Sequence, residues 1–345
     1  MPVTRQPPAV SPIPLMELAT SFWSFKTLAT AYELDLFTRL SGTGGITAQG
    51  LARELRIAER PAEMLLTGCA SLGLLDKHDD RYVNSAMSDE FLVRGKPQHF
   101  GGLITMFDRR LYAGWDKLTQ AIHTNRPTTW DPDRERSLFE SADPEMLETF
   151  WEAMHAMSRF TARALGDALD LSAFASLLDI GSGSAAFDIE LCRRYPELRA
   201  TAYDLGFVNE IAMRNIVAAG SADRVVTRDG DFFDEKLPPG HDLHLFSMVM
   251  HDWDETRDRE LLRKSYAALA NGGMVMICEL LVDDDKAGPP SAALMSLNKL
   301  IETEGRNYTA GEYVDWLSEV GFVEPQVIRF ESPGANGVVT ARKAE

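Results

Sequence analysis

The stretch SLLDIGSGSAAFDIEL, residues 176–191, decides how the rest of this chain is interpreted. Residues 176–180 are a short apolar run, as expected of a parallel strand covered on both faces. Gly181 and Gly183 supply a tight turn without Cβ atoms, and Ala185 and Ala186 allow the next helix to pack closely. The first amides of that helix face a ligand at the turn. The stretch therefore predicts a strand, a turn and a helix that hold a nucleotide-containing cofactor.

Two cofactor classes fit this spacing, and charge distinguishes them. The pattern G-x-G-x-x-G/A, with Asp204 a little over twenty residues on, also occurs in dinucleotide folds. Asp179 at the strand end and Asp188 in the first helical turn would repel a pyrophosphate. S-adenosylmethionine (SAM) instead carries an ammonium and a sulfonium, and its ribose still needs a carboxylate such as Asp204. We therefore expect SAM, bound near Asp179, Gly181, Gly183 and Asp204.

Composition restricts the partners and the location. The 345 residues are enough for two domains, and the net charge of −17 argues against nucleic acid or an anionic membrane as the main partner. The sequence shows neither a secretory leader pattern nor an apolar run of membrane-spanning length, so we expect a cytoplasmic protein. Cys69, Cys192 and Cys278 are isolated on apolar segments, which predicts buried, reduced thiols and no metal site.

The N-terminal part has the pattern of a helix-turn-helix with a wing. Residues 16–40 have helical apolar spacing, Thr47 caps a second helix, a third helix covers residues 61–72, and a strand-turn-strand covers residues 72–83. DNA binding would need basic residues on the third helix and the wing, but residues 61–73 contain no lysine or arginine. We therefore favour a dimerisation domain in which a second copy covers residues 16–40, with DNA binding as the alternative.

A mostly helical region follows. Methionine and aromatic residues at helical spacing usually belong to the core, but helices between two domains also form the apolar wall of ligand pockets. From this region we select Met106, Trp115 and Met154 as candidate substrate contacts. The expected domains are a winged-helix dimerisation domain (residues 1–100), a helical linker and substrate-pocket region (101–165) and a SAM-binding catalytic domain (166–345).

The last part of the chain alternates between strands and helices, as in a doubly wound sheet. The last two strands follow each other without a helix, which predicts an antiparallel hairpin at the edge of a parallel sheet. SAM-dependent methyltransferases have this arrangement, whereas the dinucleotide fold normally ends parallel. The strands are expected at residues 177–180, 199–203, 225–226, 243–247, 274–279, 324–330 and 337–341.

Several motifs together carry a family resemblance: LLDIGSGSA (177–185), AYDL (202–205), GDFF (230–233), MHDWDE (250–255), GGMVMICE (272–279) and GRNYT (305–309). From about residue 16 to the end, the chain resembles the large O-methyltransferase family that includes plant caffeic acid O-methyltransferases and bacterial tailoring enzymes of antibiotic and pigment pathways. The resemblance implies an α/β fold, with the Rossmann-like seven-stranded sheet of class I methyltransferases behind a mostly helical winged-helix domain. It also implies SAM as cofactor, a small-molecule substrate and a homodimer.

The resemblance also implies cofactor contacts. In the family the glycine turn contacts the methionine part of SAM, the acid after the second strand holds the ribose, and the GDFF pair brackets the adenine. By position, these roles fall on Gly181, Asp204, Asp231 and Phe232. The expected cofactor set is completed by two residues beside strand ends, Leu205 and Ser247.

The family's general base is the histidine of the HDW motif, here His251. It follows an apolar strand, so we expect it at a strand's carboxyl end, where open α/β sheets have their ligand crevice. Imidazole has an unperturbed pKa of about 6.5, so a neutral ring can accept a hydroxyl proton while its other nitrogen donates to a carboxylate. Glu279, which ends another strand, resembles the family residue with that orienting role. Asp252 is a candidate substrate contact beside the base.

One departure from the family concerns the glutamate of its G-x-E-R-T motif. Asn307 occupies that position, with Tyr308 in place of the arginine, and we include Asn307 in the catalytic set. Asparagine cannot carry the negative charge that would stabilise an imidazolium. Glu302, whose position resembles one lining the substrate pocket in relatives, and Glu304 lie just upstream. These glutamates could replace the missing charge, contact a polar substrate, or do neither.

We therefore expect a SAM-dependent methyltransferase that acts on a small molecule, with a hydroxyl acceptor and His251 as base. A thioether acceptor would need no base, and a keto-acid carbon would need an enol and possibly a metal at His251 and Asp252. Because only one histidine occurs in this cluster, we expect no metal. A SAM-binding protein without transferase activity, or a winged-helix regulator, is the alternative from another class. The sequence does not identify the acceptor.

Overall fold

The computed structural model describes residues 10–131 and 144–345, the side chains of residues 144–149 excepted. The chain forms two compact units, Met1–Asp108 and Arg109–Glu345. The boundary between the units lies inside the expected linker region, and the finer division at residues 100 and 165 stays a prediction.

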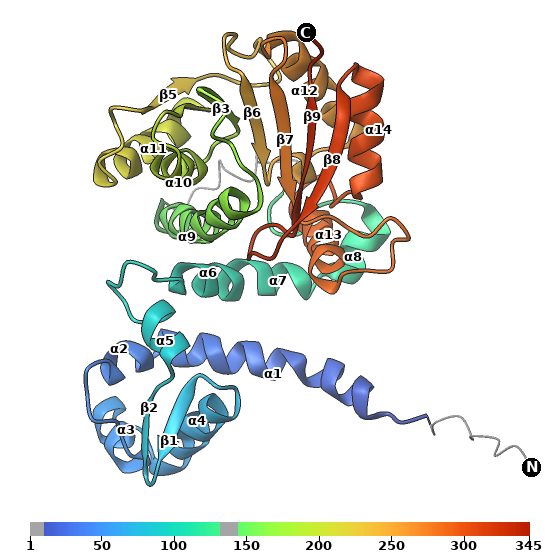
Figure 1. Ribbon diagram of the computed structural model, residues 1–345. Helices are drawn as coiled ribbons and strands as arrows, with labels where there is room; N and C mark the ends of the chain where they lie inside the picture. Colours follow the sequence, from blue (N-terminus) through green and yellow to red (C-terminus); the bar gives the residue numbers. More distant parts are fainter. Residues whose placement is uncertain (1–9, 132–143) are drawn as a thin grey trace, which may run out of the picture. The chain divides into compact units, whose positions relative to one another are not determined.

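The first unit is helical with one small hairpin (Figure 1). Strands β1 (Leu75–His78) and β2 (Arg81–Asn84) pair antiparallel directly after two helices, in the order expected of a helix-turn-helix with a wing. Thr47 caps the first of these helices by accepting a hydrogen bond from Gly50 N, as the sequence indicates. The helices of this unit are α1 (Ile13–Glu33), α2 (Leu36–Leu40), α3 (Ala48–Leu55), α4 (Glu59–Ser71), α5 (Ala86–Phe91) and α6 (Gly101–Met106).

The segment of residues 16–40 differs from the expectation of one helix. It forms α1 and α2, separated at Asp35, whose φ of 58° lies in the left-handed region. Aspartate tolerates this conformation better than most residues, and its Oδ1 accepts a hydrogen bond from Arg94 Nε at 3.1 Å. The prediction of a single continuous helix was therefore wrong, because apolar spacing alone does not show a local reversal of φ.

The second unit contains a seven-stranded sheet in the order β5-β4-β3-β6-β7-β9-β8. Strands β3 to β7 are parallel, and β9 is antiparallel to both β7 and β8, which confirms the expected closing hairpin. Strand β5 is longer than the sequence indicated. The strands are β3 (Ser176–Ile180), β4 (Arg199–Asp204), β5 (Val225–Asp229), β6 (Leu243–Ser247), β7 (Met274–Glu279), β8 (Val323–Arg329) and β9 (Gly337–Arg342).

Helices cover both faces of this sheet (Figure 1). One face packs against α9 (Pro144–Ala168), α10 (Ala186–Arg194) and α11 (Gly206–Ala218). The other packs against α12 (Glu255–Ala268) and α14 (Ala310–Val320). Successive residues of β7 enter the two cores in turn, so the strand is apolar up to its last residue, Glu279, as expected of a doubly covered strand. The remaining helices of this unit are α7 (Tyr112–Trp115), α8 (Leu118–Thr124) and α13 (Pro290–Glu302).

The strand order places the candidate residues. The chain runs outward from β3 through β4 to β5 and then returns to the other side of β3 with β6, so the topological switch lies between β3 and β6. Ligands of open α/β sheets bind at the carboxyl ends of the strands beside such a switch. Gly181, Asp204, Ser247 and Glu279 all lie at that edge of the sheet.

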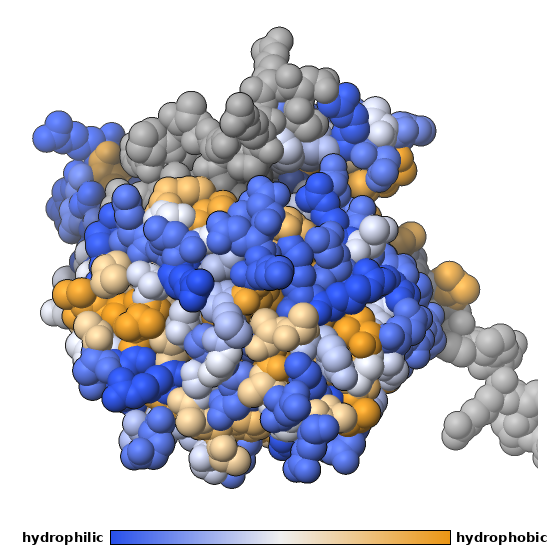
Figure 2. Space-filling model, turned by 90° about the horizontal axis from the view of Figure 1, so that it is seen from above, coloured by the Kyte–Doolittle hydropathy of each residue, from blue (hydrophilic) through white to orange (hydrophobic). Residues whose placement is uncertain are grey.

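Figure 2 shows one face of the molecular surface, coloured by hydropathy. Seen from above, it is mostly hydrophilic, with hydrophobic residues in small separate groups (Figure 2). Among the residues that the structure describes, no helix is both long enough and apolar enough to cross a membrane. Cys69, Cys192 and Cys278 are buried free thiols, as expected.

Candidate functional site

The glycine turn after β3 has the geometry that the sequence predicted. Gly181 and Gly183 have φ of 73° and 56°, in the left-handed region that favours glycine. A Cβ on Gly181 would lie 2.7 Å from Val249 Cγ2, so no larger residue fits without displacing the chain after β6. The turn is fixed to β4 by a hydrogen bond from Gly181 N to Tyr203 O at 2.9 Å.

Asp204, the expected ribose ligand, ends β4 and faces the same turn. Its carboxylate accepts hydrogen bonds from Gly183 N at 2.8 Å and from Leu205 N at 2.7 Å. Burial raises the pKa of Asp204 to about 6, although these two amides act in the opposite direction. A carboxylate has about four lone-pair sites, so this one still has room for hydroxyl donors. Leu205 follows it and is 38% exposed.

The GDFF segment forms the next part of this edge. Asp231 caps its own turn by accepting a hydrogen bond from Phe233 N at 2.8 Å. Phe232 lies near Gly181, within 3.5 Å of the position a Cβ would take there, and its ring meets Trp253 edge-on with centroids 6.1 Å apart. Lys264 Nζ donates to the carbonyls of Phe232, Phe233 and Glu235 and holds the segment in place. The sequence did not indicate this lysine.

Asp179 lies near the end of β3, as expected. Its side chain is fully buried, as is that of Asp188 in the first turn of α10, and the four carboxyl oxygens have no hydrogen-bond donor among the described residues. The sequence analysis placed Asp179 at the strand end without indicating that its side chain is completely buried. Unpaired acids below the turn fit a cationic ligand such as SAM and disfavour a pyrophosphate.

His251 and Glu279 meet at the ends of neighbouring strands. His251 lies in the 3-10 turn Met250–Asp252 after β6, is 6% exposed, and places Nδ1 2.6 Å from Glu279 Oε2. The contact is short, but it is not aligned as a hydrogen bond in this structure. Glu279 Oε1 accepts a hydrogen bond from Val249 N at 3.1 Å, so the carboxylate is fixed to the same turn. This arrangement leaves His251 Nε2 as the nitrogen for a substrate proton.

Asp252 is bound to a lysine that the sequence analysis did not select. Lys299 Nζ on α13 donates to Asp252 Oδ1 at 2.9 Å, while Asp252 Oδ2 lies 3.8 Å from His251 Nε2. Burial disfavours the charge of Lys299, but Asp252 and Glu302 outweigh this and raise the pKa of the ammonium. A charged lysine whose side chain is only 12% exposed therefore contacts Asp252, the residue next to the candidate base.

The position of Glu302 bears on whether this glutamate replaces the charge missing at Asn307. It is buried at the end of α13, where Oε2 accepts a hydrogen bond from Asn298 at 2.8 Å and Oε1 lies 3.5 Å from Arg110 Nε. Burial raises its pKa, although Lys299 and Arg110 oppose the shift. Glu304 is exposed. Glu302 is thus part of a paired cluster and does not stand beside His251 as a second free carboxylate.

Two tryptophans complete this cluster. Trp115 Nε1 donates to Asn298 Oδ1 at 3.0 Å, and Trp130 Nε1 donates to Glu302 O at 2.6 Å. Trp115 was a candidate substrate contact, whereas Trp130 was not selected. The spacing of Asn298 and Glu302, four residues apart on one helix face, was the available signal for the cluster.

Asn307 contacts the residue that follows Glu279. Its Nδ2 donates to Leu280 O at 2.7 Å and its backbone N donates to Ser296 Oγ at 2.9 Å, so it fixes the chain directly after β7. Its Oδ1 is buried without a partner among the described residues. Tyr308, in the family's arginine position, donates to Trp253 O at 2.8 Å.

The remaining candidates are spread over both units. Met154 is partly buried on α9, and Ser247 is buried at the end of β6. Met106 lies in the first unit, where it is buried on α6. His155, beside Met154, was not predicted, and its Nδ1 lies 2.9 Å from Ser184 Oγ in the glycine turn.

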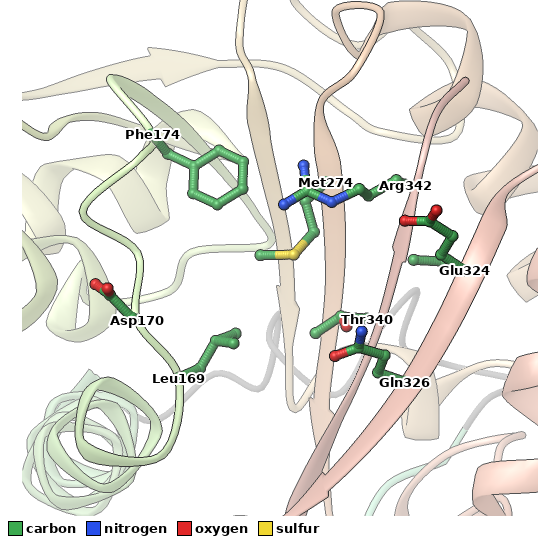
Figure 3. Close-up of a pocket in the computed structure, with 9 residues that line it drawn as sticks. Leu169, Asp170, Phe174, Met274, Glu324, Gln326, Thr340 and Arg342 are labelled. Carbon is green, nitrogen blue, oxygen red and sulfur yellow. The ribbon is translucent and has the colours of Figure 1, made fainter. Parts of the chain in front are cut away.

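A separate small pocket lies at the opposite edge of the sheet. Figure 3 shows Met274, the first residue of β7, with Thr340 and Arg342 of β9 and Phe174 beside them. Its volume is about 110 Å³, and none of the candidate site residues lines it. Because ligands of this sheet class bind at the carboxyl ends of the strands, this pocket is not the cofactor site.

Sequence comparisons agree with this geometry. The profile of the O-methyltransferase domain matches residues 115–323, and that of the O-methyltransferase dimerisation domain matches residues 16–94. The chain belongs to the O-methyltransferase family. This methyltransferase is 47% identical to 3-hydroxy-5-methyl-1-naphthoate 3-O-methyltransferase of Streptomyces sahachiroi, over 98% of the chain and 97% of the relative. It is 33% identical to the tetracenomycin polyketide synthesis 8-O-methyltransferase TcmO of Streptomyces glaucescens, over 92% and 94%.

Solved structures give the same assignment. Human N-acetylserotonin methyltransferase in complex with SAM matches with a TM-score of 0.87 and 26% identity, over the whole of both chains. PigF with SAH matches with a TM-score of 0.81 and 25% identity, over 97% of this chain and 100% of PigF. The protein is therefore a SAM-dependent O-methyltransferase that transfers a methyl group to a hydroxyl of a small molecule. Among the acceptors considered from the sequence, oxygen is thus favoured over sulfur and carbon.

Proposed function

We propose that His251 is the general base for the acceptor hydroxyl and that Glu279 orients it. The 2.6 Å approach of His251 Nδ1 to Glu279 Oε2, at the strand edge that holds the cofactor turn, is the observation that carries this proposal. A carboxylate on Nδ1 selects the tautomer in which Nε2 is free to accept a proton. It also stabilises the imidazolium that forms.

The reaction balances with one proton transfer. SAM supplies an electrophilic methyl group. As the acceptor oxygen forms its bond to the methyl carbon, the carbon–sulfur bond breaks and the hydroxyl proton passes to His251 Nε2. Glu279, with its second oxygen held by Val249 N, keeps the ring in place during the transfer. Asp252 lies 3.8 Å from Nε2, and the ammonium of Lys299 offsets its negative charge.

We further propose that the acceptor is a hydroxylated fused aromatic compound, as in the naphthoate relative. Support comes from 47% identity over 98% of the chain and from the half-buried aromatic and methionine side chains of Trp115 and Met154. Flat aromatic acceptors suit such walls because ring stacking and sulfur–aromatic contacts are favourable. Lys299, which pairs with Asp252, and Glu302, which pairs with Arg110, are the polar candidates for contact with such an acceptor.

A panel assay tests the acceptor. The purified enzyme is incubated with SAM and with hydroxynaphthoates, simple phenols, a thioether and a keto acid. The methylated products are identified by mass spectrometry. Methylation of a hydroxynaphthoate at oxygen, at a higher kcat/KM than of a simple phenol, supports the proposal. Preference for a single-ring phenol would contradict the fused-ring acceptor. Transfer to sulfur or carbon would contradict the hydroxyl mechanism.

The assembly is proposed to be a homodimer. Residues 16–94 match the dimerisation domain, and the N-terminal half of α1 exposes a series of large apolar side chains. An uncovered apolar surface of this kind favours association with a second copy. These side chains are Ile13, Leu15, Met16, Leu18, Phe22 and Trp23, each 49–72% exposed. The cytoplasmic location expected from the sequence stays a prediction.

A further inference from the structure

Two buried carboxyl groups beneath the glycine turn have no role in the mechanism above. Asp179 is the fourth residue of β3 and Asp188 is the third residue of α10, so they flank the turn of Gly181 and Gly183. Both side chains are 0% exposed. A buried acid without a partner is costly, so this arrangement calls for a compensating proton or cation.

The two groups interact with each other. Their carboxyls are close enough to share a hydrogen bond, but two ionised carboxylates only accept, so neither satisfies the other unless one carries a proton. Among the described residues, no lysine, arginine or histidine forms an ion pair with either group. The pair therefore holds at least one proton when no cation is near.

The surroundings favour protonation. Burial, and then the charge of Asp188, raise the pKa of Asp179 well above its ordinary value, and burial raises that of Asp188 to about 7. The other titratable groups that face the pair are Asp204 on β4 and the thiols of Cys192 and Cys278. Asp204 adds negative charge, and the thiols stay neutral because burial raises their pKa values.

We propose that the Asp179–Asp188 pair releases a proton when SAM binds at the turn above it, and that this makes the enzyme prefer the cationic cofactor to its neutral product. SAM carries one more positive charge, on sulfur, than S-adenosylhomocysteine. A second negative charge on the pair becomes favourable beside that cation and unfavourable again once the methyl group has left. The pair thus strengthens SAM binding and weakens product binding. This inference rests on SAM as cofactor and is independent of the acceptor.

Calorimetry of cofactor binding tests the proposal without turnover. SAM and S-adenosylhomocysteine are titrated at neutral pH into the full-length enzyme in buffers of different ionisation enthalpy, which gives the number of protons released. We expect proton release with SAM and much less with S-adenosylhomocysteine. The affinity for SAM should also rise between mildly acidic and neutral pH, with a weaker rise for S-adenosylhomocysteine.

Asp188→Asn isolates the pair, because it keeps the shape of the side chain and removes the second ionisation. We expect about tenfold weaker SAM binding with little change for S-adenosylhomocysteine, and less proton release on SAM binding. Asp204 releases the same number of protons in the parent enzyme and in Asp188→Asn. The difference in proton release between the two enzymes therefore reports the ionisation of Asp188. Asp223→Asn, at a side chain that is 74% exposed in the same unit, is the charge-matched control and should change neither value.

Two results would overturn the proposal. The first is a binding heat for SAM in the parent enzyme that is the same in every buffer, which would show that no proton is released. The other is equal weakening of SAM and S-adenosylhomocysteine binding in Asp188→Asn, which would show a merely structural role. If that variant fails to fold, the buffer and pH series on the parent enzyme decide the question alone.

Discussion

Nδ1 of His251 lies 2.6 Å from Oε2 of Glu279, although the two residues are 28 positions apart in the sequence (279 − 251). Adjacent parallel strands bring them together, because β6 and β7 pair side by side and both strands end at the same edge of the sheet. The proposed base and the acid proposed to orient it are thus placed by backbone pairing. Substitutions in and around this pair should affect turnover more than cofactor binding.

Removal of the base should slow transfer strongly. We expect His251→Ala to lower kcat by about 100- to 10,000-fold, the usual contribution of general-base catalysis, with SAM affinity close to that of the parent. The parent rate should fall in acid, because a protonated imidazole cannot accept a proton. Steady-state kinetics over a pH series and calorimetry of SAM binding measure both. An active variant with a flat pH profile would rule out the base mechanism.

The ammonium of Lys299 should influence His251 by offsetting the negative charge of Asp252. In Lys299→Met, the carboxylate of Asp252, 3.8 Å from His251 Nε2, loses its ammonium partner and favours the protonated ring. We expect the acid limb of the rate–pH profile to move to higher pH, with SAM affinity unchanged. Lys299→Arg keeps the charge and should retain the parent profile. Identical profiles for all three enzymes would show that this ion pair does not influence the base.

Gly305 should be needed for the position of the HDW turn. A Cβ at this residue would lie 2.2 Å from His251 O and 2.5 Å from Trp253 N, so Gly305→Ala forces the turn to shift. We expect kcat to fall about 100-fold, since small misplacement of a catalytic group has that effect. Gly44→Ala, where nothing lies within 4 Å of the added atom, is the matched control and should be silent. Equal kcat in both variants would contradict the prediction.

Glu312 should stabilise the fold in a pH-dependent way. It accepts hydrogen bonds from Thr309 N at 2.8 Å and from Arg306 Nη2 at 2.9 Å. Burial acts to raise the pKa of Glu312, but these partners outweigh it and lower the pKa from 4.5 to about 2. A lowered folded pKa contributes stability above the unfolded value, and that stability is lost as the pH falls through the folded value.

Glu312→Gln keeps the capping box but removes the charge, so it should reduce the free energy of unfolding by about 1 kcal/mol at neutral pH, the upper range for a charge at an exposed helix N-terminus. The difference from the parent should shrink as the pH falls below 4.5 toward 2. Denaturant unfolding at neutral and acidic pH measures it. A difference that stays constant with pH would assign the effect to packing instead of charge.

The exposed face of α1 should mediate self-association. We expect the parent to be a dimer at micromolar concentration, and Phe22→Asp with Trp23→Asp to shift it toward monomer, because two charges would enter an apolar interface. Light scattering gives the mass of each. Glu17→Gln, on the same helix, is a control that should leave the mass unchanged. A monomeric parent would refute the homodimer.

Much of the fold was predictable because it depends on local patterns. The apolar runs of the parallel strands, the glycine turn at Gly181 and the hairpin without an intervening helix each follow from residues close together in sequence. The break at Asp35 escaped prediction because a single φ reversal leaves the apolar spacing intact. Residues recognised by their position in a motif, such as His251 and Glu279, could also be selected from the sequence.

The sequence by itself determined the fold class, the cofactor and the residues at the strand ends, since strand order and register carry each of these ends to one edge of the sheet. Only the tertiary structure decided what surrounds them. Lys299 beside Asp252 and Glu302 paired with Arg110 join segments whose spacing in the chain carries no signal. The sequence placed Asp179 and Asp188 at the two ends of one turn, but it did not show that both are completely buried. Burial makes these charges matter for the site, because low solvent access strengthens every electrostatic interaction between charged groups.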